Sequence, residues 1–198
     1  MTIDVRTFAQ VNAIDTCAIW NVLSSPKLVS AALAKQCWFV VADYIRYEAL
    51  VRPRTNPEAS ELELQAKFRD HLQKNHGFFS QSVNLADLQA VANMPAIRRL
   101  GRGEIAAIAL ARRLRISFMT DDQQARAKAR CVDDRPVNTT PHLLGWLTFD
   151  GALNDSDFGI IVAEHEASIP RQRGQLTKFF KVTYEEACRC RLAGTHAP

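Results

Sequence analysis

The sequence lacks the features of a membrane or secreted protein. No stretch reaches about eighteen consecutive apolar residues, the length that a membrane-spanning helix needs. The first ten residues include Asp4 and Arg6, where a signal peptide would have an apolar stretch. The five cysteines are an odd number with no disulfide framework, and neither they nor the five histidines have zinc-ligand spacing. We therefore expect a cytoplasmic protein with reduced thiols and no membrane contact.

Internal repeats and low-complexity segments are also absent from the 198 residues, of which 47% are hydrophobic. A chain of this length and apolar content suits one α/β domain with an appendage better than two full domains. We predict a core over residues 1–139 and a helical extension packed on it over residues 140–198.

Strands and helices are predicted to alternate through the core. Short segments rich in β-branched and aromatic residues predict five strands, at 11–15, 37–41, 78–83, 116–120 and 136–138. The segments between and beside them predict helices, at 16–23, 26–35, 42–51, 57–74, 85–93, 101–114 and 121–130. The helix at 101–114 is almost wholly apolar after Glu104, so we expect it to be buried. This alternation predicts a parallel sheet covered by helices on both faces.

The extension is predicted to be helical throughout. Thr140 and Pro141 form a helix start signal, with Thr140 as the capping residue. Two further helices are expected around 158–169 and 183–192. The apolar faces in GWL and FGIIV make the extension a candidate surface for a partner or a second copy of the chain, so a homo-oligomer is expected. Packing of these faces on the core explains them equally well.

Basic residues gather in two parts of the sequence, although the net charge is only +4. The first group comprises Arg98, Arg99, Arg102, Arg112, Arg113, Arg115, Arg126, Lys128 and Arg130. The second comprises Arg171, Arg173, Lys178, Lys181, Arg189 and Arg191. Such clusters attract phosphate backbones, and solvated helix faces are the alternative explanation.

Acidic residues occur where the predicted topology would bring them together. Asp15 follows the first strand, and Asp121 and Asp122 follow the fourth, so they share the carboxyl edge of the sheet, where ligands bind. Glu104 and Glu48 lie on helices within reach of that edge. Converging carboxylates repel one another unless a cation neutralises them, and Mg²⁺ or Mn²⁺ suits an all-oxygen site. Taken singly, each has an ordinary explanation, as a helix cap, a helix-dipole partner or an exposed helix residue.

The order AIDT (13–16), YEAL (47–50) and GEIAAIALARRLRISFMTDD (103–122) resembles the PIN-domain family, which includes the VapC-type toxins. Members similarly have an Asp after the first strand, a Glu on an early helix, an acid opening a later helix and a strand ending in Thr-x-Asp. The Gly-Glu opening at Glu104 is similar to a subgroup of the family, as is VNTTPHLLGWL. The resemblance covers about residues 11–150.

The resemblance implies a three-layer α/β/α sandwich that hydrolyses phosphodiester bonds, most often in RNA, and therefore an endoribonuclease. It implies that Asp15, Glu104 and Asp122 hold one or two Mg²⁺ or Mn²⁺ ions, with Asp121 as the alternative to Asp122. Glu48 would complete the cluster and orient or deprotonate the attacking water. The supporting residues would be Thr16 and Thr120, and those gripping the nucleic-acid backbone Arg102, Arg112 and Arg126. Many such proteins are toxins restrained by an antitoxin partner.

Two departures from the family pattern keep an alternative open. Cys17 stands where many members have Ser or Asn, and Glu104 where Asp is more usual. Both favour a non-catalytic PIN-like module that binds RNA or a protein. A phosphoaspartyl phosphatase is a weaker alternative, because its motif requires Asp-x-Asp after the first strand and this chain has Asp15-Thr16-Cys17.

Overall fold

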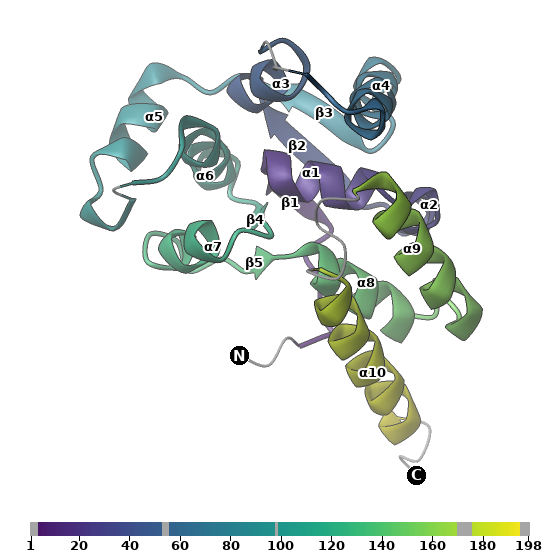
Figure 1. The fold of residues 1–198 in the computed structure, drawn as a ribbon. Coiled ribbons are helices and arrows are strands. Elements are labelled where there is room, and N and C mark those ends of the chain that lie inside the picture. The colour runs from purple at the N-terminus through teal and green to yellow at the C-terminus, as the bar shows by residue number, and fades with distance from the viewer. Residues whose placement is uncertain (1–3, 53–55, 98, 170–175, 195–198) are drawn as a thin grey trace.

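The computed structural model describes residues 4–52, 56–97, 99–169 and 176–194. These residues form an α/β fold around one five-stranded, all-parallel sheet flanked by helices (Figure 1). The predicted α/β class is confirmed, and the architecture is consistent with the three-layer sandwich.

All five predicted strands are present. They are β1 (Val11–Ile14), β2 (Trp38–Ala42), β3 (Phe78–Gln81), β4 (Ser117–Met119) and β5 (Val137–Asn138). Their order across the sheet is β3-β2-β1-β4-β5. After β1, the strands β2 and β3 are added on one side of it, and β4 and β5 are then added on the other side. The direction in which strands are added therefore reverses between β1 and β4. Open parallel sheets bind ligands at the carboxyl side of such a reversal.

The predicted core helices are also present. They are α1 (Thr16–Leu23), α2 (Pro26–Ala34), α3 (Asp43–Leu50), α4 (Ala59–Gln73), α5 (Leu85–Ala92), α6 (Arg102–Leu114) and α7 (Gln123–Arg130), with a short 3-10 turn at Pro95–Ile97. Helix α6 is buried as predicted, and its small alanine side chains allow it to contact β1, β2 and β4.

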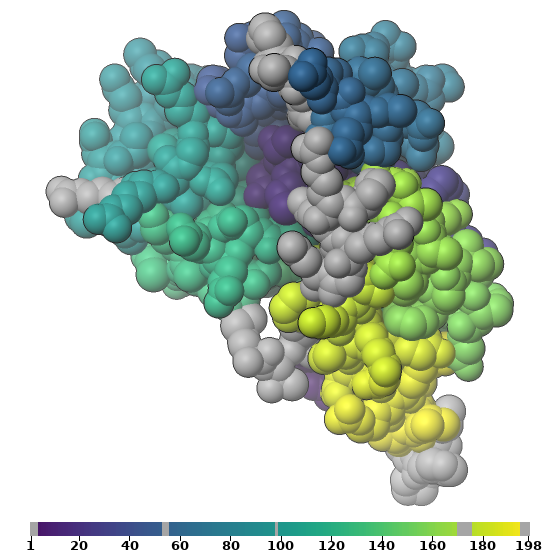
Figure 2. Space-filling model, viewed as in Figure 1, coloured from purple at the N-terminus to yellow at the C-terminus, as the bar shows by residue number. Residues whose placement is uncertain are grey.

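The extension contains the helices α8 (Thr140–Phe149), α9 (Asp155–Ser168) and α10 (Thr177–Gly194). Helix α10 begins six residues before the predicted segment 183–192 and packs along α8. At their contact a Cβ on Gly145 would lie 2.9 Å from the Cβ of Thr183, so only glycine allows the two helices to come this close. Figure 2 shows the extension, in green and yellow, lying against the core and projecting from it.

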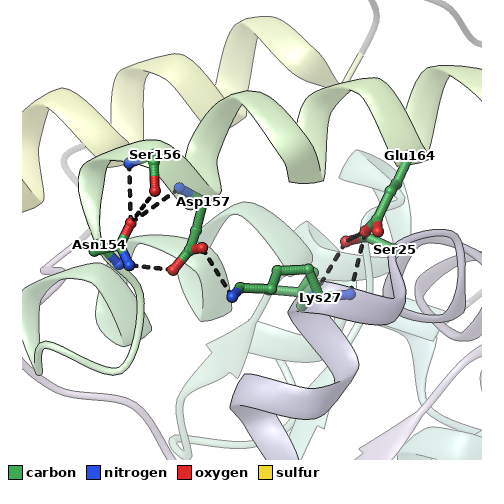
Figure 3. Close-up of polar contacts among 7 residues, drawn as sticks. Ser25, Lys27, Asn154, Ser156, Asp157 and Glu164 are labelled. Atoms are coloured by element: carbon green, nitrogen blue, oxygen red, sulfur yellow. Dashed lines mark hydrogen bonds and ion pairs between the residues drawn. The ribbon is translucent and has the colours of Figure 1, made fainter.

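Polar contacts join α9 to α2 (Figure 3). Lys27 Nζ lies 2.8 Å from Asp157 Oδ1, and the Ser25 hydroxyl donates to Glu164 Oε2 at 2.5 Å. The backbone N–H of Asn154 donates to Asp157 Oδ2 at 2.9 Å, which closes a capping box at the start of α9. Asp157 is only 4% exposed, so this ion pair belongs to the packed boundary between core and extension.

Several predicted helix starts are displaced, among them that of α7, which begins two residues later than predicted, and that of α9, which begins three residues earlier. Two further displacements have a clear physical cause. Thr139, not Thr140, caps α8 by accepting the His142 N–H at 3.1 Å, while the Thr140 hydroxyl is used elsewhere. Helix α4 begins at Ala59 instead of Pro57, because Glu58 and Glu61 form the capping contacts there. Residues 53–55 of the loop before it lie outside the described residues, as do Arg98, Arg171 and Arg173 of the basic groups.

Within the described residues, no single helix is long and apolar enough to cross a membrane. Only α1 and α2 taken together reach the required length and hydropathy, and they are bent by 99° relative to each other.

Candidate functional site

The carboxyl ends of β1, β4 and β5 bring three polar segments to one edge of the sheet. The register pairs Ile14 with Met119 and Met119 with Asn138, so the residues that follow each strand are neighbours. The Asp15 N–H donates to the Met119 carbonyl at 3.2 Å, which extends the β1–β4 pairing to the site itself. Asp15, Thr120 and Thr140 therefore meet although long segments of chain separate them.

Asp15 is a buried carboxylate, 4% exposed. It caps α1 by accepting the Ala18 N–H at 2.8 Å, and its other oxygen accepts the Thr120 hydroxyl at 2.5 Å. Burial raises the pKa of Asp15 to about 7, because these two hydrogen bonds compensate only in part for the loss of water, and the charges of Asp121 and Glu104 raise it further. Within the described chain, no lysine or arginine pairs with Asp15.

Thr120 is fully buried and links Asp15 to the loop that leads into α7. Its hydroxyl donates to Asp15 Oδ2 and accepts the Asp122 N–H at 3.1 Å. A single side chain thus fixes both the first acid and the backbone of the last one. Thr16, the other predicted supporting residue, opens α1 but makes no side-chain hydrogen bond within the described residues.

Asp121 and Asp122 have different environments. The carboxylate of Asp121 accepts three hydrogen bonds, from Asn21 Nδ2 at 2.8 Å, Thr140 N at 2.8 Å and the Thr140 hydroxyl at 2.5 Å. Asp122 is exposed and caps α7 through Oδ1, which accepts the Ala125 N–H at 2.7 Å. Its Oδ2 accepts no hydrogen bond within the described chain. Asp122 therefore keeps one carboxylate oxygen without a hydrogen bond from the described residues, whereas both oxygens of Asp121 accept hydrogen bonds.

Glu104 and Glu48 approach the same edge from α6 and α3. The Glu104 Oε2 accepts the Gly101 N–H at 2.6 Å, so this side chain bends back over the start of its own helix. A Cβ on Gly103 would lie 2.4 Å from Glu48 Oε2, so the missing side chain leaves the space that Glu48 occupies. Burial raises the pKa of Glu48, Arg52 lowers it and the charge of Glu104 raises it. The glycine of the Gly-Glu pair at the start of α6 therefore leaves room for the Glu48 carboxylate.

Cys17 lies within this group of acids. Burial raises the pKa of its thiol, and the charges of Asp121, Asp15 and Asp122 raise it further, so the thiol stays protonated at neutral pH. Its Sγ lies 3.8 Å from Asn21 Nδ2, the group that also binds Asp121. A neutral thiol fills this position without adding charge or a strong hydrogen bond.

Metal binding is supported by the type of donor atoms more than by their spacing. Carboxylate oxygens are the ligands that Mg²⁺ and Mn²⁺ prefer, and a buried carboxylate with a raised pKa is stabilised in its charged form by a cation. Among the described residues, however, no three His, Cys, Asp or Glu side chains are close enough together to hold a metal ion. Glu104 would have to release Gly101 to join such a group.

The predicted phosphate-binding arginines occupy separate places. Arg102 is exposed in the first turn of α6, and Arg112, in the last turn of the same helix, donates to Met94 Sδ at 3.0 Å. Arg126 lies on α7, where it lines a cleft that also includes Asp121. Arg126 thus shares a concave surface with one acid of the site, Asp121.

Asn21 and Thr140 were not predicted to be part of the site, where both donate hydrogen bonds to Asp121. Asn21 lies among the buried apolar residues of α1 and is itself only 3% exposed. A polar side chain on the buried face of a helix needs a partner, and that signal was available from the sequence. Thr140 was expected to cap its own helix, so its contact with Asp121 was not.

Comparison of the chain with models of known families, with curated proteins and with solved structures found no significant match.

Proposed function

We propose that this protein is a divalent-metal-dependent nuclease whose substrate is RNA. The observation that carries the proposal is Asp15, a buried carboxylate with no cationic partner among the described residues, held at the reversal point of a parallel sheet beside other acids. A buried charge without a partner is unfavourable for folding alone, and functional sites are where such costs are retained. The PIN-type order of the acidic motifs supports the same function.

The roles of the side chains follow from their contacts. Asp15, Asp122 and Glu104 would hold the metal, with Thr120 fixing Asp15 and the Asp122 backbone. Asn21 and Thr140 hold Asp121, which keeps the loop after β4 in place. Glu48 is the base that takes a proton from the attacking water, and its raised pKa brings it closer to neutral pH, where a general base is most effective. A bound Mg²⁺ or Mn²⁺ supplies charge neutralisation at the phosphate and a more acidic water.

A second function is favoured by one specific observation. Glu104 is engaged in capping its helix, and no three acids of the described chain gather closely enough for a metal. A non-catalytic module that binds RNA or protein would have this arrangement and would not need to rearrange it. The two functions differ in whether the bound strand is cut.

Restraint by an antitoxin is a further part of the proposal, which the motif order supports. A protein that inhibits translation by cutting RNA would have to be held inactive by such a partner in the cell that makes it. Expression of the chain alone should then arrest growth, whereas expression of the Asp15→Ala variant should not.

The test is cleavage of labelled single-stranded RNA, structured RNA and DNA by the purified protein with Mg²⁺, Mn²⁺ or EDTA. The Asp15→Ala and Asp122→Asn variants should lose cleavage, and Asn at 122 keeps the cap of α7 because Asn and Asp cap helices equally well. Asp157→Asn is the matched control, since it changes an acid outside the site. Metal-dependent cutting that disappears only in the site variants supports the nuclease. Absence of cutting by folded, metal-supplied wild-type protein contradicts it and favours the binding module.

A further inference from the structure

A cleft of about 840 Å³ lies between α7 and β5 on one side and α10 on the other. Figure 1 shows α7 and α10 on either side of β5, the edge strand of the sheet. Asp121 and Thr139, at the carboxyl ends of β4 and β5, belong to the lining. The cleft therefore adjoins the acidic centre and joins it to the extension.

The α7 wall of the cleft is basic. Arg126 and Arg130, one helical turn apart, both line it, and Arg126 makes no hydrogen bond or ion pair within the described chain. The acids of the lining are mostly engaged: Asp4 pairs with Arg6 at 2.8 Å, Glu186 with Arg189 at 2.9 Å, and Asp133 with Arg135. Asp121 is held by its three hydrogen bonds, which leaves the exposed Asp134. An unpaired guanidinium beside engaged acids is available to an anionic ligand.

The α10 wall is apolar and exposed. Phe179 and Val182 are 59% and 62% exposed, although both lie in the cleft lining. Phe180, the next residue along the helix, is fully buried and does not line the cleft, so α10 packs on the rest of the extension with one face and presents another to the cleft. An exposed phenylalanine opposite arginines is the combination that binds single-stranded nucleic acid, with phosphates on the cations and a base against the ring.

We infer that this cleft binds one flank of a single-stranded nucleic acid, with Arg126 on its phosphates and Phe179 against a base. The inference rests on the proposed function for the identity of the strand, and it extends that function by assigning a binding role to α10. Single strands are favoured over duplexes because only unpaired bases offer their faces to an aromatic side chain. The extension thus serves as one wall of the substrate path.

Binding can be measured separately from cleavage by fluorescence anisotropy of a short labelled single-stranded RNA, and of DNA of the same sequence, in EDTA at low salt. Arg126→Ala and Phe179→Ala should each weaken binding, by about tenfold for Phe179→Ala given the usual worth of one stacked base. Arg126→Ala should also reduce the salt dependence, by about 0.7 in the slope of log affinity against log salt. The matched controls are Arg69→Ala and Leu62→Ala on α4, both exposed and outside the cleft.

Unchanged binding in both cleft variants, or equal loss in the α4 controls, would overturn the inference. So would wild-type protein that binds no single strand, which would favour a protein segment as the occupant. The two proposals separate cleanly. If the cleft variants weaken binding but the wild-type protein cuts no RNA in the presence of metal, the cleft assignment holds and the nuclease proposal is contradicted. If the wild-type protein cuts RNA and the cleft variants bind and cut as well as it does, the nuclease proposal holds and the cleft assignment is contradicted.

Discussion

Two carboxylates with little exposed surface differ in whether the protein provides a cationic partner for their charge. Asp157, at the boundary of α2 and α9, lies 2.8 Å from Lys27 and accepts the Asn154 N–H, and these contacts lower its pKa. Asp15, at the carboxyl edge of the sheet, has only neutral donors, and burial raises its pKa to about 7. Both residues are 4% exposed, but Asp15 lies deeper in the molecule, so its charge loses more hydration than that of Asp157 in addition to lacking a cationic partner.

The difference separates a finished structural contact from an incomplete one. The Lys27 pair needs nothing beyond the chain, whereas the charge of Asp15 has no cation beside it among the described residues, so a bound metal ion would stabilise it. A structural acid should therefore affect stability and leave chemistry alone. A functional acid should support chemistry at a cost to stability.

The largest expected effect is on catalysis. Asp15→Asn should reduce metal-dependent cleavage on the order of 10²- to 10³-fold, because a ligand for the metal loses its charge. Asp157→Asn should leave the rate per folded molecule unchanged. Initial rates on the best RNA substrate, with folding checked by circular dichroism, provide the measurement. Equal losses of cleavage in both variants would contradict a special role for Asp15.

Substitution of Gly103 should reach the same chemistry without touching an acid. Gly103→Ala places a methyl group 2.4 Å from the position of Glu48 Oε2, so the flexible carboxylate must move away. Cleavage should fall by roughly 10- to 100-fold, the range for disturbed supporting contacts, while the helix gains up to about 1 kcal/mol. Gly159→Ala on α9 is the matched control, because a Cβ there has no neighbour within 4 Å. If both alanine variants cut normally, the position of Glu48 beside Gly103 is not needed for cleavage.

The pH dependence of stability should show that Asp15 is a cost to folding. Its pKa is about 7 in the folded protein, above the ordinary value of 3.8, so its contribution favours folding at low pH and is lost as the pH rises to about 7. At pH 8, Asp15→Asn should raise the free energy of unfolding by on the order of 2 kcal/mol in metal-free buffer. The gain should be much smaller at pH 5. Urea unfolding at both pH values measures it, and a loss of stability at pH 8 would show that the hydrogen bonds outweigh burial.

The structural acid should behave in the opposite way. Asp157→Asn removes the ion pair with Lys27 and weakens the capping box of α9, at a cost of about 1 kcal/mol. Because the ion pair lowers the pKa of Asp157, this loss should be greatest at neutral pH and diminish in acid. Thermal unfolding at neutral and acidic pH tests both statements. A variant as stable as the wild type would make the contact dispensable.

The smallest effect is expected at Thr140, where the first helix of the extension contacts the acidic site of the core. Thr140→Val keeps the shape of the side chain and the N–H that binds Asp121, but removes the hydroxyl donor. Asp121 retains Asn21, so cleavage should fall only several-fold and stability by about 1 kcal/mol. Thr140→Ser should restore both values. Failure of serine to restore them would mean that packing, not the hydroxyl, matters at this position.

Much of the fold could be predicted because local signals agreed with the global pattern. Asp15 before an apolar run marked the start of α1, and the β-branched segment before it marked β1, so both boundaries were close to those observed. The start of α8 was displaced because two adjacent threonines can each act as a cap, and local sequence does not decide between them. The tertiary contact of Thr140 with Asp121 decides it.

The acids of the site were found from topology, since strands that alternate with helices bring their carboxyl ends to one edge. Their individual environments could not be predicted. The different surroundings of Asp121 and Asp122 depend on Asn21, a hundred residues away in sequence, and the space for Glu48 depends on a helix crossing at Gly103. Such contacts follow from packing in three dimensions, which no local pattern encodes.

The hydrogen bond between Thr120 and Asp15 joins residues 105 positions apart, and this separation affects how the protein comes into being. Contacts so distant in sequence form slowly, because a long loop must close before they contribute. During synthesis, Asp15 leaves the ribosome long before Thr120. Thr140, which binds Asp121, is synthesised 19 residues after it. A nascent or truncated chain that ends before Thr140 carries the acids without their supports. Any chemistry of this centre is therefore delayed until most of the chain has been made.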